Sequence, residues 1–295
     1  MTQVDLHRHL EGAIRVSTVV DRCRSLGLEV PPLEVLEPTP LLAALKRFDG
    51  FRLAVQSLDD VDRIFHEAVE DAVAEGLTAV ELRFSPWTLA RAAGASVAEV
   101  VRRVAALPAT VELPVSVVVI VSRSRGLDAA WEVVRASEDV EVAGADFASD
   151  EVRVPTRAFR EVAEAFVARG LPLTVHTGEG TPASAIREAL DLPGVRRLGH
   201  ALSLIDDPDL VAEVRDREIV VECCPTSNVR VGLAEYDAHP GPRLSAAGVQ
   251  VAICTDDPTL FGIDLAHELD VARGWGWSEA QIAASMALAH RARFR

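Results

Sequence analysis

Two histidines near the start of the chain, His7 and His9, have a type and spacing that can bind a metal ion. They lie in a short, mainly apolar run, residues 4–9, that predicts a β-strand. Because successive side chains of a strand point to opposite faces, both imidazoles project from the same face, as two ligands of one ion must. A pair of surface histidines has the same pattern. The metal interpretation therefore depends on further polar residues elsewhere in the chain.

Histidine and acidic residues recur directly after three later apolar runs, in the segments His176-Thr177-Gly178-Glu179, Gly199-His200 and Thr255-Asp256-Asp257. Imidazole nitrogens together with a carboxylate oxygen form a ligand set suited to zinc. Zinc lowers the pKa of a bound water from about 15.7 towards 7, which makes hydroxide available at neutral pH. These segments predict a hydrolytic zinc site with four candidate ligands, His7, His9, His176 and Asp256.

The elements that must bring these residues together are eight short apolar runs, which alternate with longer stretches of helical periodicity. The runs span residues 4–9, 78–84, 115–121, 140–146, 171–176, 195–199, 218–222 and 249–255. Eight strand–helix units predict an α/β fold, a (β/α)8 or TIM barrel, that comprises the whole chain, 1–295, as one domain. In such a barrel the active site lies at the carboxyl ends of the strands, where the polar segments follow the runs.

The first connection, of about 70 residues, is much longer than the others. Its segment 41–48 has the apolar spacing of an amphipathic helix and predicts a helical insertion after the first strand, either a lid over the site or an ordinary packing helix. Lys46, the only lysine of the chain, also lies in this connection. Related barrels that hold two metal ions bridge them with a carboxylated lysine on the fourth strand, so we expect one zinc ion per chain.

Three residues beside the candidate ligands are of types that hold or move protons. Glu179 lies between two glycines, where its carboxyl group can face a substrate and act as a general acid, although a solvated loop acid has the same pattern. His200 is placed to orient an attacking water. Asp257 either accepts a hydrogen bond from a substrate nitrogen or caps a helix that begins at Pro258.

The composition excludes several classes of partner. Lys and Arg number 30 against 45 Asp and Glu, a formal net charge of −15, and no basic tract offsets it, so we do not expect nucleic-acid binding. No apolar run approaches the roughly 20 residues that span a membrane, and no signal pattern is visible, which predicts a cytoplasmic protein that binds a small molecule. The four cysteines are too few for a disulfide framework. The oligomeric state is left open.

The order of these motifs over nearly the whole chain resembles the adenosine deaminase family of zinc-dependent (β/α)8 barrels. The matching segments are His7-Arg8-His9-Leu10-Glu11-Gly12, Arg83-Phe84-Ser85-Pro86, residues 146–151, His176-Thr177-Gly178-Glu179, Gly199-His200, Cys224-Pro225-Thr226-Ser227-Asn228 and Thr255-Asp256-Asp257-Pro258. The resemblance implies that the four candidate ligands bind zinc, that Glu179 protonates purine N1, and that His200 and Asp256 orient the water. It further implies that Asp257 pairs with N7, that hydroxide adds to C6 and that ammonia leaves.

The resemblance also implies contacts that shape the rest of the pocket. The backbone at Ser149 contacts purine N3, and Leu42, Leu45 and Phe48 help to form an apolar lid. The chain departs from the family in two places. Glu11 stands where adenosine-preferring members have an Asp that contacts the ribose 5′-hydroxyl, and Ser149 stands where the family usually has Gly.

The sequence therefore predicts a zinc-dependent hydrolytic deaminase that converts a 6-aminopurine nucleoside into its 6-oxo product and ammonia. Because Glu11 is one methylene longer than Asp, we expect a 6-aminopurine nucleoside altered on the 5′ side of ribose or in its substituent to be preferred, with adenosine itself as the fallback substrate. Aminodeoxyfutalosine and free adenine are alternative substrates within the family. Alternatives from other classes are a zinc barrel that hydrolyses a cyclic amide or ester, and a non-catalytic binding protein on the same fold.

Overall fold

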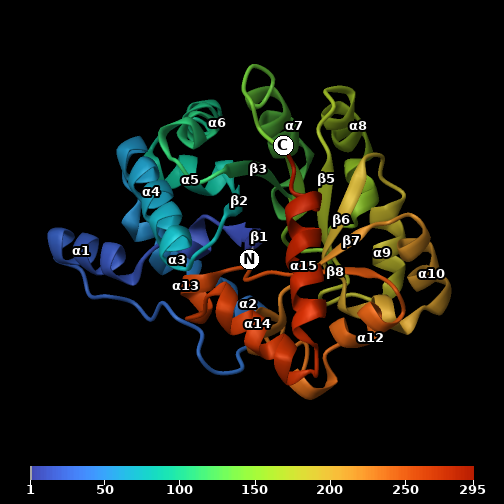
Figure 1. The fold of residues 1–295 in the computed structure, drawn as a ribbon. Coiled ribbons are helices and arrows are strands. Elements are labelled where there is room, and N and C mark those ends of the chain that lie inside the picture. The colour runs from blue at the N-terminus through green and yellow to red at the C-terminus, as the bar shows by residue number, and fades with distance from the viewer. Residues whose placement is uncertain (1) are drawn as a thin grey trace.

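The computed structural model describes residues 2–295, apart from the side chains of Leu42 and Leu45. Eight parallel strands, paired in chain order, form its centre (Figure 1). Two further backbone hydrogen bonds join the last strand to the first: the N–H of His9 donates to the carbonyl of Asp256 at 2.8 Å, and the N–H of Asp256 donates to the carbonyl of His7 at 2.7 Å. The sheet therefore closes, and the predicted (β/α)8 barrel is confirmed.

The strands are β1 (Val4–His9), β2 (Ala79–Phe84), β3 (Val115–Ser122), β4 (Gly144–Ala148), β5 (Leu173–Thr177), β6 (Val195–His200), β7 (Val220–Cys223) and β8 (Gln250–Ile253). Seven of them overlap the predicted runs closely, but β4 begins four residues later than predicted. Its first residue, Gly144, pairs with Val118 of β3. A side chain at position 144 would collide with Phe294 and the carbonyl of Pro172, so only glycine fits at the start of this strand.

Helices surround the barrel and connect its strands. Their bounds are α1 (Val16–Leu26), α2 (Leu41–Leu45), α3 (Phe48–Phe51), α4 (Leu58–Ala74), α5 (Pro86–Ala93), α6 (Val97–Ala106), α7 (Gly126–Ala136), α8 (Arg160–Ala168), α9 (Ala183–Leu190), α10 (Pro208–Asp216), α11 (Pro225–Arg230), α12 (Gly241–Ala246), α13 (Pro258–Phe261), α14 (Leu265–Gly274) and α15 (Glu279–Ala292). Within residues 2–295, none of these helices combines the length and the apolarity needed to cross a membrane.

The sequence explains how these helices begin and which face they bury. The hydroxyl of Ser96 accepts a hydrogen bond from the N–H of Glu99, whose carboxylate accepts one from the N–H of Ser96, so α6 begins with a capping box. In α4 the buried residues recur at helical spacing, namely Val61, Ile64, Phe65, Ala68, Val69 and Ala72. Such a stripe packs against the barrel because each buried large apolar side chain contributes about 1.5–3 kcal/mol.

The connection between β1 and β2 contains the predicted helical insertion. It includes α1, α2 and α3 and two short 3-10 helices, η1 (Glu11–Ala13) and η2 (Arg52–Ala54), before the long helix α4 returns along the barrel. Helix α3 packs against η1, and η2 packs against α1 and α5. The insertion therefore lies beside the loops that follow β1 and β2.

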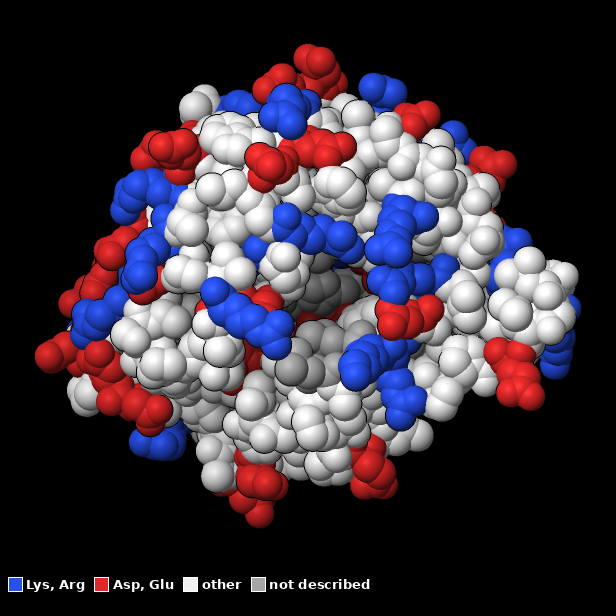
Figure 2. Space-filling model, turned by 180° about the vertical axis from the view of Figure 1, so that it is seen from behind, with Lys and Arg blue, Asp and Glu red and all other residues white. Residues whose placement is uncertain are grey.

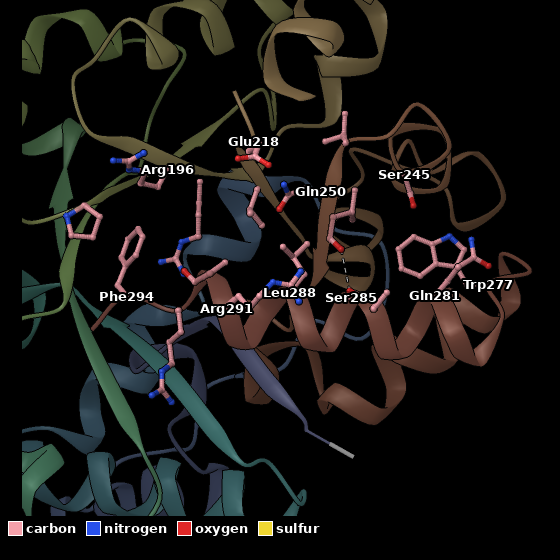
Figure 3. A pocket seen from close by; sticks show the side chains of 18 residues that line it. Arg196, Glu218, Ser245, Gln250, Trp277, Gln281, Ser285, Leu288, Arg291 and Phe294 are labelled. Atoms are coloured by element: carbon pink, nitrogen blue, oxygen red, sulfur yellow. Dashed lines mark hydrogen bonds between the residues drawn. The ribbon is translucent and has the colours of Figure 1, made fainter. Parts of the chain in front are cut away.

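The last helix, α15, packs against β1 and β8 and leaves a cavity of about 740 Å³ between itself and the amino ends of the strands (Figure 3). Arg196, Val220 and Gln250, which line this cavity, stand at or next to the first residues of β6, β7 and β8. The predicted chemistry requires the opposite, carboxyl end of the barrel. This cavity is therefore separate from the candidate active site.

Candidate active site

The four predicted metal ligands meet at the carboxyl ends of β1, β5 and β8. Nε2 of His176 lies 3.0 Å from Nε2 of His7 and 3.3 Å from Nε2 of His9. The Oδ1 atom of Asp256 lies 3.2 Å from Nε2 of both His7 and His9. Zinc bonds of about 2.0–2.1 Å in a tetrahedral arrangement place neighbouring ligand atoms about 3.3 Å apart. The spacing of these four atoms therefore fits one zinc ion.

His200 lies next to this cluster, and its imidazole, with ligand atoms of His7, His176 and Asp256, falls in a group whose atoms all lie within 4.8 Å of one another. Its Nε2 atom is 3.9 Å from Asp256 and 3.9 Å from Glu179. Its Nδ1 atom lies 3.0 Å from the side-chain amide nitrogen of Asn228, which donates to it. His200 therefore carries its proton on Nε2 and points an N–H group into the space between the two carboxyl groups.

Two buried carboxylates, neither of which the sequence patterns indicated as functional, orient the imidazoles. Nδ1 of His7 donates to Glu222 at 2.8 Å, and Nδ1 of His176 donates to Asp146 at 2.9 Å. Each bond fixes the tautomer in which Nε2 carries a lone pair for a metal. Both acids occur inside otherwise apolar strand runs, a pattern that can be recognised because an isolated acid in a buried strand requires a partner.

Arg83 links these two carboxylates inside the barrel. Its Nη1 atom donates to Asp146 at 2.9 Å and its Nη2 atom donates to Glu222 at 3.0 Å, and all three side chains are fully buried. Burial alone would raise the pKa of Asp146, but His176 and Arg83 outweigh it and hold the pKa below its usual range. Burial is also outweighed at Glu222, where Arg83 and Arg197 lower the pKa. Both acids therefore stay ionised.

The ligands themselves are held in different protonation states by their surroundings. Burial lowers the pKa of His176 to about 3, so its imidazole is neutral and available to a metal. At His7, burial and Arg83 lower the pKa, but the hydrogen bonds to Asp256 and Glu222 outweigh them and raise it to about 9. A cation at this point replaces the proton that His7 otherwise holds.

The backbone at the strand ends is strained. Among residues 2–295, five residues other than glycine have a positive φ, and four of these lie at the carboxyl ends of β4, β6 and β8: Ser149 (76°), His200 (63°), Ala201 (49°) and Asp256 (66°). Left-handed conformations of this kind cost about 1–2 kcal/mol each and concentrate at functional sites. The strain aims His200 and Asp256 into the barrel.

The structure describes Ser149 and only one of the three predicted lid side chains. The φ of 76° explains why glycine is usual at position 149, and the hydroxyl of Ser149 is exposed and lies 2.8 Å from that of Ser124. Phe48 is partly buried, with its ring 6.4 Å from that of Phe51. The side chains of Leu42 and Leu45 lie outside the described part of the structure, so the lid stays a prediction.

Glu179 lies in the turn after β5, beside the cluster. Burial raises the pKa of its carboxyl group above the usual range, and the negative charges of Asp256 and Glu151 raise it further against the opposing effect of His200. A protonated carboxyl group at neutral pH is what a general acid requires.

Glu151, in the loop after β4, fixes the turn that carries Glu179. Its carboxylate accepts hydrogen bonds from three consecutive backbone N–H groups: Gly178 at 2.9 Å, Glu179 at 3.0 Å and Gly180 at 2.9 Å. Successive N–H groups that converge on one carboxylate form an anion-binding nest. Although the sequence places Glu151 at the end of a motif, nothing in the sequence indicates this partner.

Asp257 does not cap the helix that follows it. Its side chain makes no cap hydrogen bond to α13, and its Oδ1 atom is buried without a partner among the described residues, so the capping interpretation is wrong. Burial raises the pKa of Asp257 well above its usual range, and the charges of Asp256 and Glu11 add to this effect. A Cβ atom at Gly12 would overlap the carboxyl group of Asp257, so only glycine fits there.

Glu11 lies near Asp257, at the start of η1. Its Oε1 atom accepts a hydrogen bond from the backbone N–H of Ser85 at 2.8 Å, while Oε2 is buried with no partner in residues 2–295. Burial raises the pKa of Glu11 to about 7. The free oxygen of Glu11 and that of Asp257 are therefore available to a ligand.

The chain was compared with known proteins. A family model described as adenosine deaminase matches residues 2–294. An adenosine deaminase of Shewanella loihica is 34% identical over 299 residues, which cover 95% of this chain and 90% of that protein. The crystal structure of adenine deaminase from Arthrobacter aurescens has a TM-score of 0.89 at 25% identity and covers 99% of this chain and 94% of its own. N6-methyl-AMP deaminase from Arabidopsis thaliana has a TM-score of 0.87 at 26% identity, with coverages of 100% and 92%.

We predict that Glu151→Gln loosens the turn that contains Glu179. The amide keeps one oxygen acceptor but loses the charge, and charge-assisted hydrogen bonds contribute about 1.5–3 kcal/mol. We therefore expect hydrogen exchange at the N–H groups of Gly178, Glu179 and Gly180 to accelerate about tenfold or more. The control, Glu164→Gln on the exposed face of α8, leaves these rates unchanged. Unchanged rates in the Glu151 variant would show that the carboxylate does not hold the turn.

Proposed function

We propose a role for each residue of the candidate active site in the deamination of aminopurines. The chain belongs to the adenosine deaminase family and is a hydrolytic deaminase of aminopurines. The main support for these roles is the convergence of His7, His9, His176 and Asp256. His176 and Asp256 each lie 3.0–3.3 Å from both His7 and His9. The carboxyl group of Glu179 and the imidazole of His200, which can move protons, lie beside them. Family membership favours this function over hydrolysis of a cyclic amide or ester and over a non-catalytic role.

One zinc ion held by these four residues would supply the Lewis acidity that activates a water molecule at neutral pH. The Nε2–H group of His200 points towards Glu179 and Asp256, 3.9 Å from each, and this gap is wide enough for a water molecule between them. Oδ2 of Asp256 also accepts a hydrogen bond from Ser227 at 2.7 Å, which fixes its orientation. His200 and Asp256 therefore orient the water for attack on C6 of the purine.

Glu179 supplies the proton that makes C6 reactive. Burial raises the pKa of its carboxyl group and so favours the protonated form, which donates to N1 of the ring as water adds to C6. The proton that the water loses on attack passes through the carboxylate of Asp256 to the 6-amino group, which leaves as ammonia. The hydroxyl group on C6 returns its proton to Glu179 as the 6-oxo product forms.

Asp257 holds the other edge of the purine. Because its pKa is raised well above the usual range, it presents an O–H group, and N7 of a 6-aminopurine is an acceptor. The pair N1–Glu179 and N7–Asp257 orients the ring with C6 towards the zinc site. The backbone at Ser149 would contact N3.

The proteins that resemble this chain differ in the sugar side of their named substrates, which are adenosine, adenine and N6-methyl-AMP. Glu11 is the residue of this chain that bears on that difference. Its Oε1 atom is held by the backbone N–H of Ser85, and its Oε2 atom is buried without a partner among the described residues. We therefore propose a nucleoside altered on the 5′ side of ribose as the better substrate, with aminodeoxyfutalosine and free adenine as alternatives.

The first prediction for this function is that the purified protein contains one zinc ion per chain. His176→Ala and Asp256→Ala should each remove the metal and the activity together, because each deletes one of four ligands. His200→Ala should keep the metal and lose activity. The control His267→Ala, at an exposed position of α14, changes neither quantity. Metal analysis that finds two tightly bound ions per chain would contradict the mononuclear site.

The second prediction concerns Glu179. Glu179→Gln should keep zinc but lower kcat by a factor of about 10² or more, the effect of losing a general acid. Since only the protonated acid is active, wild-type kcat should fall as pH rises through the raised pKa, and the variant should lack this decline. A variant that retained more than about a tenth of the wild-type rate would show that Glu179 is a loop acid.

The third prediction concerns Glu11. Glu11→Asp should shift kcat/KM towards adenosine relative to the better substrate, without changing zinc content, because a misplaced methylene changes specificity by about 10- to 200-fold. The ratios for adenosine, 2′-deoxyadenosine, adenine and aminodeoxyfutalosine in both proteins measure the effect. If wild type prefers adenosine by two orders of magnitude and the variant alters no ratio, Glu11 does not determine specificity.

A further inference from the structure

Basic side chains gather around the hollow on the face that carries the carboxyl ends of the strands. Figure 1 is viewed towards α15, which packs at the amino ends, and Figure 2 shows the opposite face, with Lys and Arg around a central hollow. The chain has 30 basic against 45 acidic residues, so such a gathering runs against its overall charge. A local excess of cations at the entrance of a site calls for a specific explanation.

Three arginines of this face form a cluster that we name the basic rim: Arg52 in η2, Arg91 in α5 and Arg125 at the end of η4 (Arg123–Arg125). They come from the loops that follow β1, β2 and β3. Burial lowers the pKa of Arg52, and the nearby positive charges of Arg91 and Arg125 lower it further.

Little in the described structure neutralises the basic rim. Arg52 pairs with Asp49, but Arg91 and Arg125 are exposed and form no ion pair within residues 2–295. The guanidinium carbon of Arg125 instead lies 5.6 Å from the centre of the Trp87 ring. By contrast, the fully buried arginines Arg83 and Arg197 are each paired with two carboxylates. The excess positive charge of the rim is therefore available to an anion.

Helix α5 links the basic rim to the part of the site that Glu11 occupies. Glu11 binds the backbone N–H of Ser85, and Ser85 is the N-cap of α5. Trp87 and Arg91 follow on the same helix, one turn apart, and η2 packs against α5. At about 1.5 Å per residue, Arg91 lies about 9 Å along the helix from Ser85. Arg91, and the Trp87 ring that Arg125 approaches, therefore lie on the helix whose N-cap residue is bound by Glu11.

We infer that this site takes aminopurine nucleosides that carry an anionic group, a phosphate or a carboxylate, on the 5′ side of ribose, and that Arg91 and Arg125 bind that group. This inference rests on the proposed function and names its substrate class. Guanidinium groups bind both anions through paired N–H donors. The rim also offsets the repulsion that a protein of net charge −15 otherwise exerts on an anionic substrate.

The test compares kcat/KM for adenosine, AMP and adenosine 5′-carboxylic acid in wild type and in the double variant Arg91→Gln/Arg125→Gln. We expect wild type to prefer one of the two anionic substrates over adenosine by about tenfold or more, and the double variant to lose most of that preference. The substrate with the larger preference distinguishes phosphate from carboxylate. Raising the ionic strength from about 0.05 to 0.5 M should also reduce the wild-type preference, because salt screens exposed charges.

The matched control is Arg196→Gln. Arg196 is an exposed arginine at the amino end of β6, where it lines the cavity of Figure 3, and it should alter none of the three values. Preference for adenosine over both anionic substrates, or an equal preference in wild type and double variant, would overturn the inference while leaving the deaminase function intact. If these three compounds, free adenine and aminodeoxyfutalosine all fail to release ammonia, the proposed function and the inference are overturned together.

Discussion

The need to pair charges inside a closed barrel is the constraint on which the site depends. Arg83 is fully buried between Asp146 and Glu222, and each of these acids orients one histidine of the cluster. Removing one partner of such a pair costs about 3–5 kcal/mol, a large part of the roughly 5–15 kcal/mol that stabilises a domain. The interactions that keep the barrel interior ionised and paired are therefore the same ones that hold His7 and His176 in position.

Above this paired layer, the strand ends leave ideal geometry. His200 and Asp256 adopt left-handed backbone conformations, and Asp256 also joins β8 to β1 through backbone hydrogen bonds to His7 and His9. The same backbone hydrogen bonds that close the barrel therefore also position the carboxylate of Asp256. The strain free energy of these residues is offset by the stability of a barrel whose strands are each paired on both sides.

The mouth of the site consists of loops that the barrel constrains less. Glu151 reaches from one loop to the next and binds three N–H groups of the turn that holds Glu179. Glu11 and the basic rim lie on the insertion and on the loops after β2 and β3. The deaminases that resemble this chain are named for adenosine, adenine and N6-methyl-AMP, which differ on the sugar side of the purine.

The sequence by itself indicated the barrel, the helical insertion and the strand ends at which His7, His9, His176 and Asp256 lie, because strand periodicity and polar strand ends are local patterns. Only the tertiary structure decided what these residues touch. Asp146, Glu222 and Glu151 bind partners 30, 215 and 27 to 29 residues away, at distances set by strand register and loop packing. The free side chain of Asp257 and the late start of β4 likewise depend on neighbours distant in sequence. A pattern read along one strand cannot contain them, because burial and pairing arise only when the barrel closes.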